Sequence, residues 1–403
     1  MKYVPIPIAM LPVGKPLPVN VWNADGVLLL RKGQPIVSEQ HRDKLYDHNA
    51  STTEAEAEAW QRSYERMVHS LLQEGVDVQD IARMPMPSAI RERDYHTGEQ
   101  LNGGWLDLQE VLRGILYQGG LALNPVPRLT AIENKARSLL KEDPDDSLFC
   151  LFQALADSTL GYCATHALLC AVVCELAAQK LGLDDHQRQA LMSAALTMNI
   201  GMAREQDVLA RQSSAPSEAQ RKLIQEHPQL SVEILRGYGI DGAEELDLVR
   251  WHHLPDTPEG LAHTLSSRRL LSMTDVFVAK MAARRTREAL SPLESAKSIY
   301  LQTEKEVTAS VGAALTAAVG FYPPGTYVRL VGGETAVAVQ RGARANTPWV
   351  IVIVDKNGMP TFNYHCLDSA DPANAIASPM LFRSGKVVIN GERVRRAREK
   401  IRR

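Results

Sequence analysis

The chain has 403 residues, of which 45% are hydrophobic and 23% charged, and its formal net charge is -2. This length allows two or three domains. The nearly balanced charge gives no general attraction to nucleic acid or to a membrane surface. No apolar run reaches the ~18–20 residues that a membrane span requires, since the nearest, 167–174, is followed by Glu175. We therefore expect a cytoplasmic protein with no membrane span and no nucleic-acid partner.

The five cysteines are odd in number and include no CxxC pair. Cys163, Cys170 and Cys174 are spaced at i, i+7 and i+11, which places them on one face of a helix. Buried thiols in a reducing cytosol explain this pattern better than a disulfide or a thiolate site.

Residues 1–50 predict a small β-rich module. Strand-like runs at 19–22 and 27–30 flank a turn, and Ser38 is placed to cap a short helix that ends at Leu45. The module has too few apolar residues for a large domain, so it predicts a docking or dimerisation element.

Residues 51–146 predict helices joined by linkers. Ser51-Thr52-Thr53-Glu54 resembles a helix start, and 84–105 is rich in proline and glycine, as a linker is. Helical patterning returns at 106–112 and 129–141 and is interrupted at Asp143-Pro144.

Residues 147–322 predict a domain of amphipathic helices, followed by a β segment over 323–366 and a loop with a basic tail over 367–403. The tail is expected to be disordered or a surface helix. The expected helices are 147–157, 159–181, 186–198, 217–236, 243–253, 264–284 and 291–316. The expected strands are 327–331, 335–340 and 349–354.

Potential metal ligands recur on successive helices of the helical domain: His166, His227-Pro228, His252-His253 and Asp275, with Met198-Asn199 between the first two. In order and spacing these motifs resemble the HD-GYP family, the cyclic di-GMP phosphodiesterase branch of the HD metal-dependent phosphohydrolases. The resemblance covers 150–340, roughly. It implies a mainly α fold, an HD-type helical bundle with a small N-terminal β module and a short C-terminal β segment. It also implies metal ligation by His166, His227, His252, His253 and Asp275.

The sequence departs from the family pattern at the His-Asp doublet, which is Met198-Asn199 here. The following lysine is Met202, and the Gly-Tyr-Pro loop is absent from 254–262. Asn199 is neutral and cannot bridge two dications as the family's aspartate does, and the thioether of Met198 suits iron or manganese poorly.

Among the remaining ligand positions only Asp275 is anionic, so several dications would leave a large uncompensated charge. The sequence therefore predicts no catalytic residue and at most one residual divalent ion, iron or manganese. Structural roles are the alternative: His227 can pack or cap beside Pro228, and adjacent His252 and His253 point in different directions.

Arg284 and Arg287 are candidate contacts for the phosphates of a bound nucleotide. The alternative is a solvated helix end, where cations are favoured.

The leading hypothesis is a catalytically impaired HD-GYP-like signalling protein. It would bind a regulator or cyclic di-GMP and pass on a conformational state through its N-terminal module to a protein partner, as a monomer or homodimer. Two alternatives stay open: an active metal-dependent cyclic di-GMP phosphodiesterase with a substituted site, and a metal-free protein-interaction scaffold.

Overall fold

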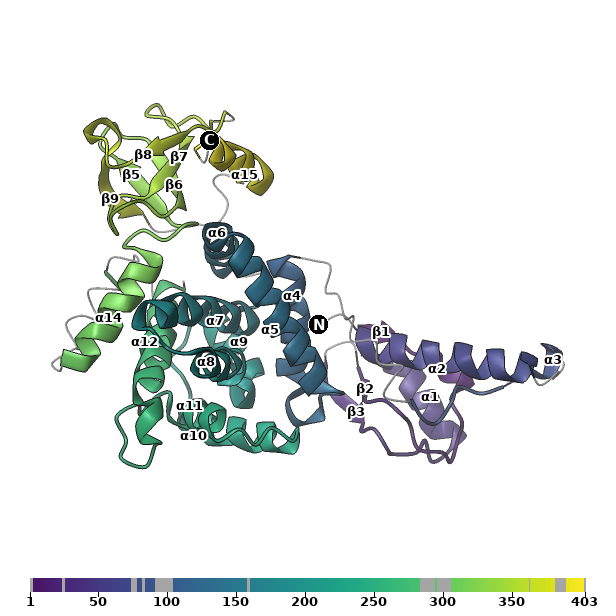
Figure 1. Cartoon of the computed structure of the whole chain (residues 1–403). Helices are drawn as coiled ribbons and strands as arrows, with labels where there is room; N and C mark the ends of the chain where they lie inside the picture. Colours follow the sequence, from purple (N-terminus) through teal and green to yellow (C-terminus); the bar gives the residue numbers. More distant parts are fainter. Residues whose placement is uncertain are drawn as a thin grey trace. The chain divides into compact units, whose positions relative to one another are not determined.

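A computed structural model describes residues 3–23, 26–73, 78–81, 84–90, 104–157, 160–282, 294–295, 306–361, 363–380 and 389–401. The chain forms two compact units (Figure 1). Unit 1 consists of Met1–Leu101 and Leu121–Ala131, and unit 2 of Asn102–Gly120 and Ile132–Arg403.

Unit 1 contains a four-stranded antiparallel sheet in the order β1-β4-β2-β3. Its elements are β1 (Tyr3–Pro5), η1 (Ile8–Met10), β2 (Val21–Trp22), β3 (Leu28–Leu30), α1 (Glu39–Asp47), β4 (Ser51–Thr53), α2 (Glu54–Gln73) and α3 (Val78–Ile81). The predicted strands at 19–22 and 27–30 are present as β2 and β3, and Ser38 caps α1 by accepting a hydrogen bond from the His41 N–H.

The expected helix start at residues 51–54 is confirmed, since α2 begins at Glu54 and Thr53 and Glu56 exchange hydrogen bonds at its N-terminus. Residues 51–53 themselves form a strand, β4, that was not predicted. The segment is polar and was therefore hard to identify as a buried strand. The buried hydroxyls of Thr52 and Thr53 both donate hydrogen bonds to the Glu56 carboxylate at 2.8 Å. These bonds offset the cost of burying the polar strand β4. The core of unit 1 extends beyond residue 50: Trp60 is buried in it and donates its indole N–H to the Pro87 carbonyl at 2.8 Å. Part of the expected linker over 84–105 is therefore packed against the core of unit 1, where Met86 is buried.

Unit 2 is mainly helical, as predicted. Its helices are α4 (Trp105–Gln118), α5 (Pro125–Glu142, which begins in unit 1), α6 (Pro144–Ala156), α7 (Tyr162–Leu181), α8 (Asp185–Thr197), α9 (Ala203–Arg211), α10 (Glu218–Gly237), α11 (Ala243–Trp251), α12 (Leu265–Met281), α14 (Glu306–Val319) and α15 (Gly391–Glu399). Short 3-10 turns are η3 (Gly119–Leu121), η4 (Ile200–Met202), η5 (Ala262–Thr264) and η6 (Pro372–Asn374).

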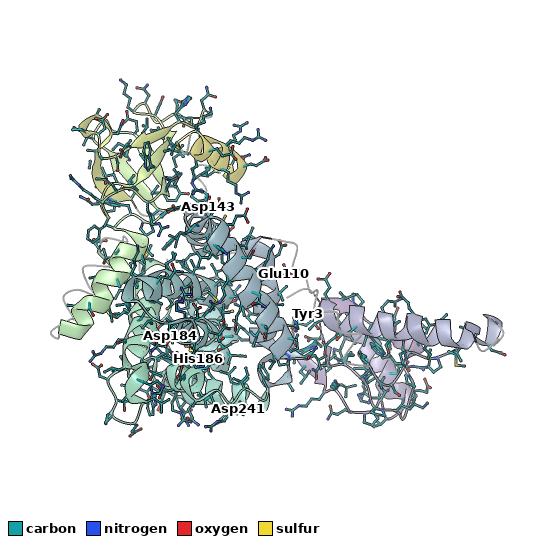
Figure 2. The ribbon with its side chains drawn as sticks, viewed as in Figure 1. Tyr3, Glu110, Asp143, Asp184, His186 and Asp241 are labelled. Atoms are coloured by element: carbon teal, nitrogen blue, oxygen red, sulfur yellow. The ribbon has the colours of Figure 1, made fainter. Side chains whose placement is uncertain are left out.

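Several helix ends follow the local sequence signals. Asp143 caps α6, and Asp184 forms a capping box with Gln187 at the start of α8 (Figure 2 labels both aspartates). Gly182 ends α7 in the left-handed conformation, with φ of 70°. The short helix α9 was not predicted. Arg284, Arg287 and the predicted Ser291-Pro292 helix start lie outside the described residues.

Helix α7 lies at the centre of the bundle and packs against α6, α8, α12 and α14. Contrary to the sequence-based expectation, it is long and apolar enough to cross a membrane, with an 18-residue window that is 89% buried inside the protein. Such burial is the pattern of a core helix, whose apolar residues run around its whole circumference.

The C-terminal part of unit 2 is a five-stranded antiparallel sheet in the order β8-β7-β6-β5-β9. Its strands are β5 (Tyr327–Leu330), β6 (Thr335–Gln340), β7 (Trp349–Val354), β8 (Cys366–Asp368) and β9 (Ile376–Met380). The three predicted strands are present, but the expectation of a loop over 367–380 is wrong. Proline at 379 disfavours a central strand and is accommodated here because β9 lies at the edge.

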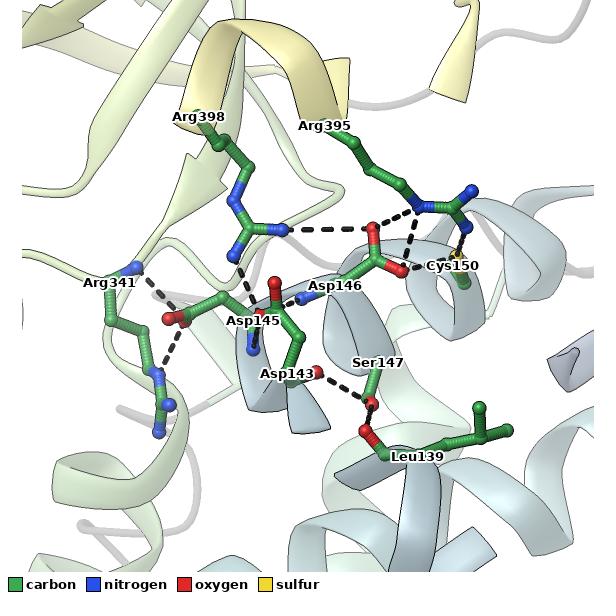
Figure 3. A network of polar contacts seen from close by, with 9 residues as sticks. All are labelled: Leu139, Asp143, Asp145, Asp146, Ser147, Cys150, Arg341, Arg395 and Arg398. Atoms are coloured by element: carbon green, nitrogen blue, oxygen red, sulfur yellow. Dashed lines mark hydrogen bonds and ion pairs between the residues drawn. The ribbon is translucent and has the colours of Figure 1, made fainter. Parts of the chain in front are cut away.

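The basic tail contains α15, which packs the buried Val394 onto the sheet. An ion-pair network joins this part to the first turn of α6 (Figure 3). Arg398, only 2% exposed, lies 2.7 Å from Asp143 Oδ1 and 3.6 Å from Asp146 Oδ1. Arg341, which follows β6, pairs with Asp145 at 2.7 Å. The sheet and α15 are thus fastened to the helical bundle by charge.

Candidate metal centre

Four helices of unit 2 bring the predicted ligand positions into two adjacent groups. His227 lies in α10, and His252 and His253 follow α11 directly. Their donor nitrogens lie within 4.8 Å of one another. His166 of α7 and Asp275 of α12 form the second group, with Nε2 and Oδ1 2.8 Å apart. Asp275 also interacts electrostatically with His252 and His253, so the two groups adjoin.

The tautomers of His227 and His252 follow from their backbone partners. Nδ1 of His227 is 2.8 Å from the carbonyl of Ile224, and Nδ1 of His252 is 2.7 Å from the carbonyl of Val249. A carbonyl oxygen only accepts hydrogen bonds, so each Nδ1 carries the proton and each neutral ring has a lone pair at Nε2.

The two Nε2 atoms of His227 and His252 face each other at 3.2 Å. Two lone pairs at this distance repel unless a cation lies between them. Two imidazoles on one tetrahedral ion, each 2.0–2.1 Å from it, would have their nitrogens about 3.3–3.4 Å apart. The observed spacing therefore fits two ligands of one ion.

A shared proton is a poorer explanation at neutral pH. Burial, followed by repulsion from His253, lowers the pKa of His227 to about 4 and that of His252 to about 3. Both rings are at most 1% exposed, whereas His253 is exposed and leaves the group open to solvent on one side.

His166 is fully buried and both its ring nitrogens have partners. Nε2 donates to Asp275, whose carboxylate can only accept, and Nδ1 lies 3.0 Å from the Tyr162 hydroxyl. Burial alone would raise the pKa of Asp275, but the hydrogen bond from His166 and the neighbouring imidazoles hold it well below its ordinary value. Asp275 is therefore the anion of the centre.

The doublet Met198-Asn199 lies at the end of α8, beside the turn of α10 that carries His227. The Ser231 hydroxyl donates to the Met198 carbonyl at 2.8 Å and accepts from the Gly201 N–H at 3.0 Å. A Cβ atom on Gly201 would lie 2.9 Å from the His227 carbonyl oxygen, so the two segments are in close backbone contact. Met198 is fully buried and Asn199 is 6% exposed.

The loop after His253 is held in place by its own set of hydrogen bonds and an ion pair. Asp247 of α11 accepts hydrogen bonds from the Leu261 N–H at 3.0 Å and from the Thr264 hydroxyl. Arg269 of α12 pairs with Asp256 at 2.6 Å. The loop is thus fixed to α11 and α12 by its own residues.

Two further residues of α7 lie beside the centre. Tyr162 and Cys170 lie one turn before and one turn after His166 on α7, and the Cys170 sulfur is 3.4 Å from His166 Nε2. The i±4 spacing was the available signal. For Cys170 the cysteine pattern favours a buried core thiol. All five cysteines are free thiols in the structure.

Comparisons with known proteins give limited information. No protein-family model matches the chain, and neither does any curated protein. Among solved structures it is similar to "Bd1817, a HDG"Y"P protein from Bdellovibrio bacteriovorus", with 16% sequence identity and a TM-score of 0.41. The similarity covers 78% of this chain and 98% of that one. Family membership is therefore proposed below from the residues of this chain.

Proposed function

We propose that this protein is an HD-GYP-like signalling protein whose centre binds one divalent ion and has lost hydrolytic activity. One observation carries the proposal: the Nε2 lone pairs of His227 and His252 face each other at 3.2 Å, each ring held by a backbone carbonyl. Outer hydrogen bonds of this kind orient histidine ligands toward a metal.

The loss of hydrolysis is inferred from charge. Phosphodiester hydrolysis by a metal cluster needs two or more dications, which stabilise both the attacking and the leaving oxygen. Asp275 is the single carboxylate among the predicted ligands, and Asn199 is neutral where the family has a bridging aspartate. One dication is compatible with one carboxylate and neutral imidazoles, whereas a cluster is not.

The proposal is tested by metal analysis and a turnover assay. Full-length protein is expected to bind about one divalent ion per chain. Incubated with cyclic di-GMP and manganese or iron, it should release no linear product. Turnover that Asp275→Ala abolishes would overturn the proposal in favour of an active phosphodiesterase. Absence of both metal and nucleotide binding, the latter by calorimetry, would favour the interaction scaffold.

A repair variant tests the placement of the doublet. Met198→His with Asn199→Asp restores an imidazole and a carboxylate, and the added negative charge should raise metal occupancy above one ion per chain. Metal content of the purified variant is the measurement, with Met192→His, a buried methionine earlier in α8, as the control. A folded double variant with unchanged occupancy would show that the doublet does not face the ligands.

A further inference from the structure

We propose that Asp247 of α11 and Arg268 of α12 are positioning residues of the metal centre: their buried ion pair sets the register of the two helices that bring His252 and Asp275 together. The inference rests on the proposed function in one respect, that a divalent ion binds at this centre. It goes beyond it by assigning the geometry of the centre to two charged residues that are not ligands themselves.

The ion pair joins both helices to the loop between them. The side chains of Asp247 and Arg268 are 7% and 2% exposed, and Arg268 Nε lies 3.7 Å from Asp247 Oδ2. Nη2 of Arg268 donates a hydrogen bond to the Leu261 carbonyl at 3.3 Å. Asp247 in turn accepts hydrogen bonds from the Leu261 N–H at 3.0 Å and from the Thr264 hydroxyl. The pair therefore holds α11, the end of the loop and α12 together at one place.

The pair and the ligands lie at two levels of the same helix interface. Asp247 precedes His252 by five residues, and Arg268 precedes Asp275 by seven. With a rise of about 1.5 Å per residue, these spacings are about 7.5 Å along α11 and about 10.5 Å along α12. The two helices pack together, and Asp275 interacts electrostatically with His252. The contacts thus follow the same order along both helices, so that two levels of contact fix their distance and their register.

Gly260 of the loop determines where the guanidinium lies. A Cβ atom on Gly260 would overlap Nη1 and Cζ of Arg268. Because Arg268 is only 2% exposed, its side chain cannot turn to solvent without giving up the contact with Asp247. A larger residue at 260 would therefore displace the guanidinium from its partner and leave the charge of the protein unchanged.

The pair is a poor device for stability alone. Among the residues that the structure describes, Nε and Nη1 of Arg268 have no hydrogen-bond partner. Burial of two charges costs free energy that their attraction offsets only with good hydrogen bonding, and apolar side chains of similar volume are often as stable. The directed contacts of Arg268 to α11 and to the loop do, however, specify one arrangement of the helices. Position explains the pair better than stability does.

Charge alone predicts the opposite effect on metal binding from position. Removal of the Arg268 guanidinium leaves the surroundings of the centre more negative, which favours a bound cation. Arg268→Met should therefore tighten metal binding if the residue acts only through its charge. If the pair positions the ligands, the same variant should weaken binding, because His252 and Asp275 then lose their register.

Cobalt(II) binding to the full-length protein tests the inference. Arg268→Met should weaken cobalt binding roughly tenfold, the lower end of the usual effect of losing an outer partner of a metal ligand. It should also change the visible ligand-field bands of the bound cobalt, which a loss of stability alone would not alter. Arg269→Met is the matched control: it removes the same charge at the next position, but its partner Asp256 lies in the loop and is 51% exposed. It should keep the bands and lose no affinity.

Circular dichroism first establishes that each variant is folded. Gly260→Ala provides a second route, since it should reproduce the weaker binding with the charge retained, and it replaces Arg268→Met should that variant not fold. Unchanged or tighter binding in Arg268→Met, or an equal loss in Arg269→Met, overturns this inference and leaves the one-ion centre standing. A parent that binds no divalent ion overturns both.

Discussion

Two backbone carbonyls determine the chemistry of the candidate centre. They hold the Nδ1–H groups of His227 and His252, so both rings direct lone pairs inward. The same arrangement disfavours protonation, because a proton added at either Nε2 would be buried beside other imidazoles. The proposed metal binding and the expected acid sensitivity therefore follow from the same geometry.

In metal-free protein, we expect stability to fall as the pH falls from about 6.5 to about 4. The folded-state pKa of His227, about 4, lies below the ordinary value of 6.5, so in this window the unfolded chain binds a proton that the folded chain does not. The protonation of His227 in the unfolded chain lowers the free energy of unfolding by roughly 3 kcal/mol over this window. His252, whose pKa is also lowered by burial, lowers it further.

Urea unfolding near pH 7 and near pH 4.5 measures this effect. His227→Gln, which cannot take up the proton, should lose less stability than the parent. Burial, with repulsion from Glu133, raises the pKa of Glu245 to about 7, which stabilises the folded state toward lower pH. The parent and His227→Gln both contain Glu245, so its contribution cancels when the stability losses of the two proteins are compared. An equal loss in both would contradict the assignment to His227.

Gly201→Ala should destabilise unit 2 by about 1–3 kcal/mol, the usual range for overpacking. The added Cβ would lie 2.9 Å from the His227 carbonyl oxygen and 3.0 Å from the Ser231 nitrogen, and backbone atoms cannot move aside as a side-chain end can. Gly237→Ala is the control, since nothing lies within 4 Å of its Cβ position. Thermal unfolding of both variants checks the prediction; equal midpoints would show that η4 and α10 are not tightly packed.

At the residue scale, the convergence of His166, His227, His252 and Asp275 was expected from the resemblance of the motif order to a known family. The helical period alone relates residues of one helix, and these four belong to different helices. The tautomers of His227 and His252 could not be predicted, because they depend on which atoms each ring nitrogen contacts in the folded protein.

At the scale of elements, the predicted helices between Pro144 and Met281 have ends within about three residues of those expected, whereas β1, β4, β8 and β9 were missed. Each missed strand is three to five residues long and β4 and β9 are polar or contain proline. Such strands are defined by pairing with a partner remote in sequence, as β9 is with β5. Local patterning carries little of that information.

Arg398→Ala should loosen the attachment of the C-terminal sheet to α6. Arg398 is 2% exposed, while its partners Asp143 and Asp146 are 21% and 19% exposed in their side chains. Removal of one member of a buried pair costs about 3–5 kcal/mol. Because these carboxylates keep some access to water, we expect about 2–3 kcal/mol.

Hydrogen exchange of β6 and β7 is the measurement, and faster exchange in Arg398→Ala is the expected result. Arg396→Ala provides the comparison, because its pair with Glu392 has both side chains 72% exposed and should contribute less than about 1 kcal/mol. Similar exchange in the two variants would mean that the apolar packing of Val394, and not the ion pairs, holds α15.

At the scale of the whole molecule, a signalling function requires that the centre in unit 2 and an output surface be coupled. Couplings of this kind are typically about 1–3 kcal/mol, or 5–150-fold in an equilibrium. With unit 1 as the proposed output, metal loading should change amide exchange in β1, β2 and β4 as well as in α7 and α12. Mass spectrometry of loaded and chelated protein measures this. Changes confined to unit 2 would contradict an output role for unit 1.

The ion pairs of Arg398 also bear on how the chain folds during its synthesis. Asp143 is synthesised 255 residues before its partner. At about 5–20 residues per second, translation separates the two by roughly 10–50 s. Over that interval the helical bundle can fold while the N-terminus of α6 offsets part of the charge of Asp143, Asp145 and Asp146. The nascent chain therefore carries an acidic helix start whose arginine partners, Arg341, Arg395 and Arg398, are synthesised later.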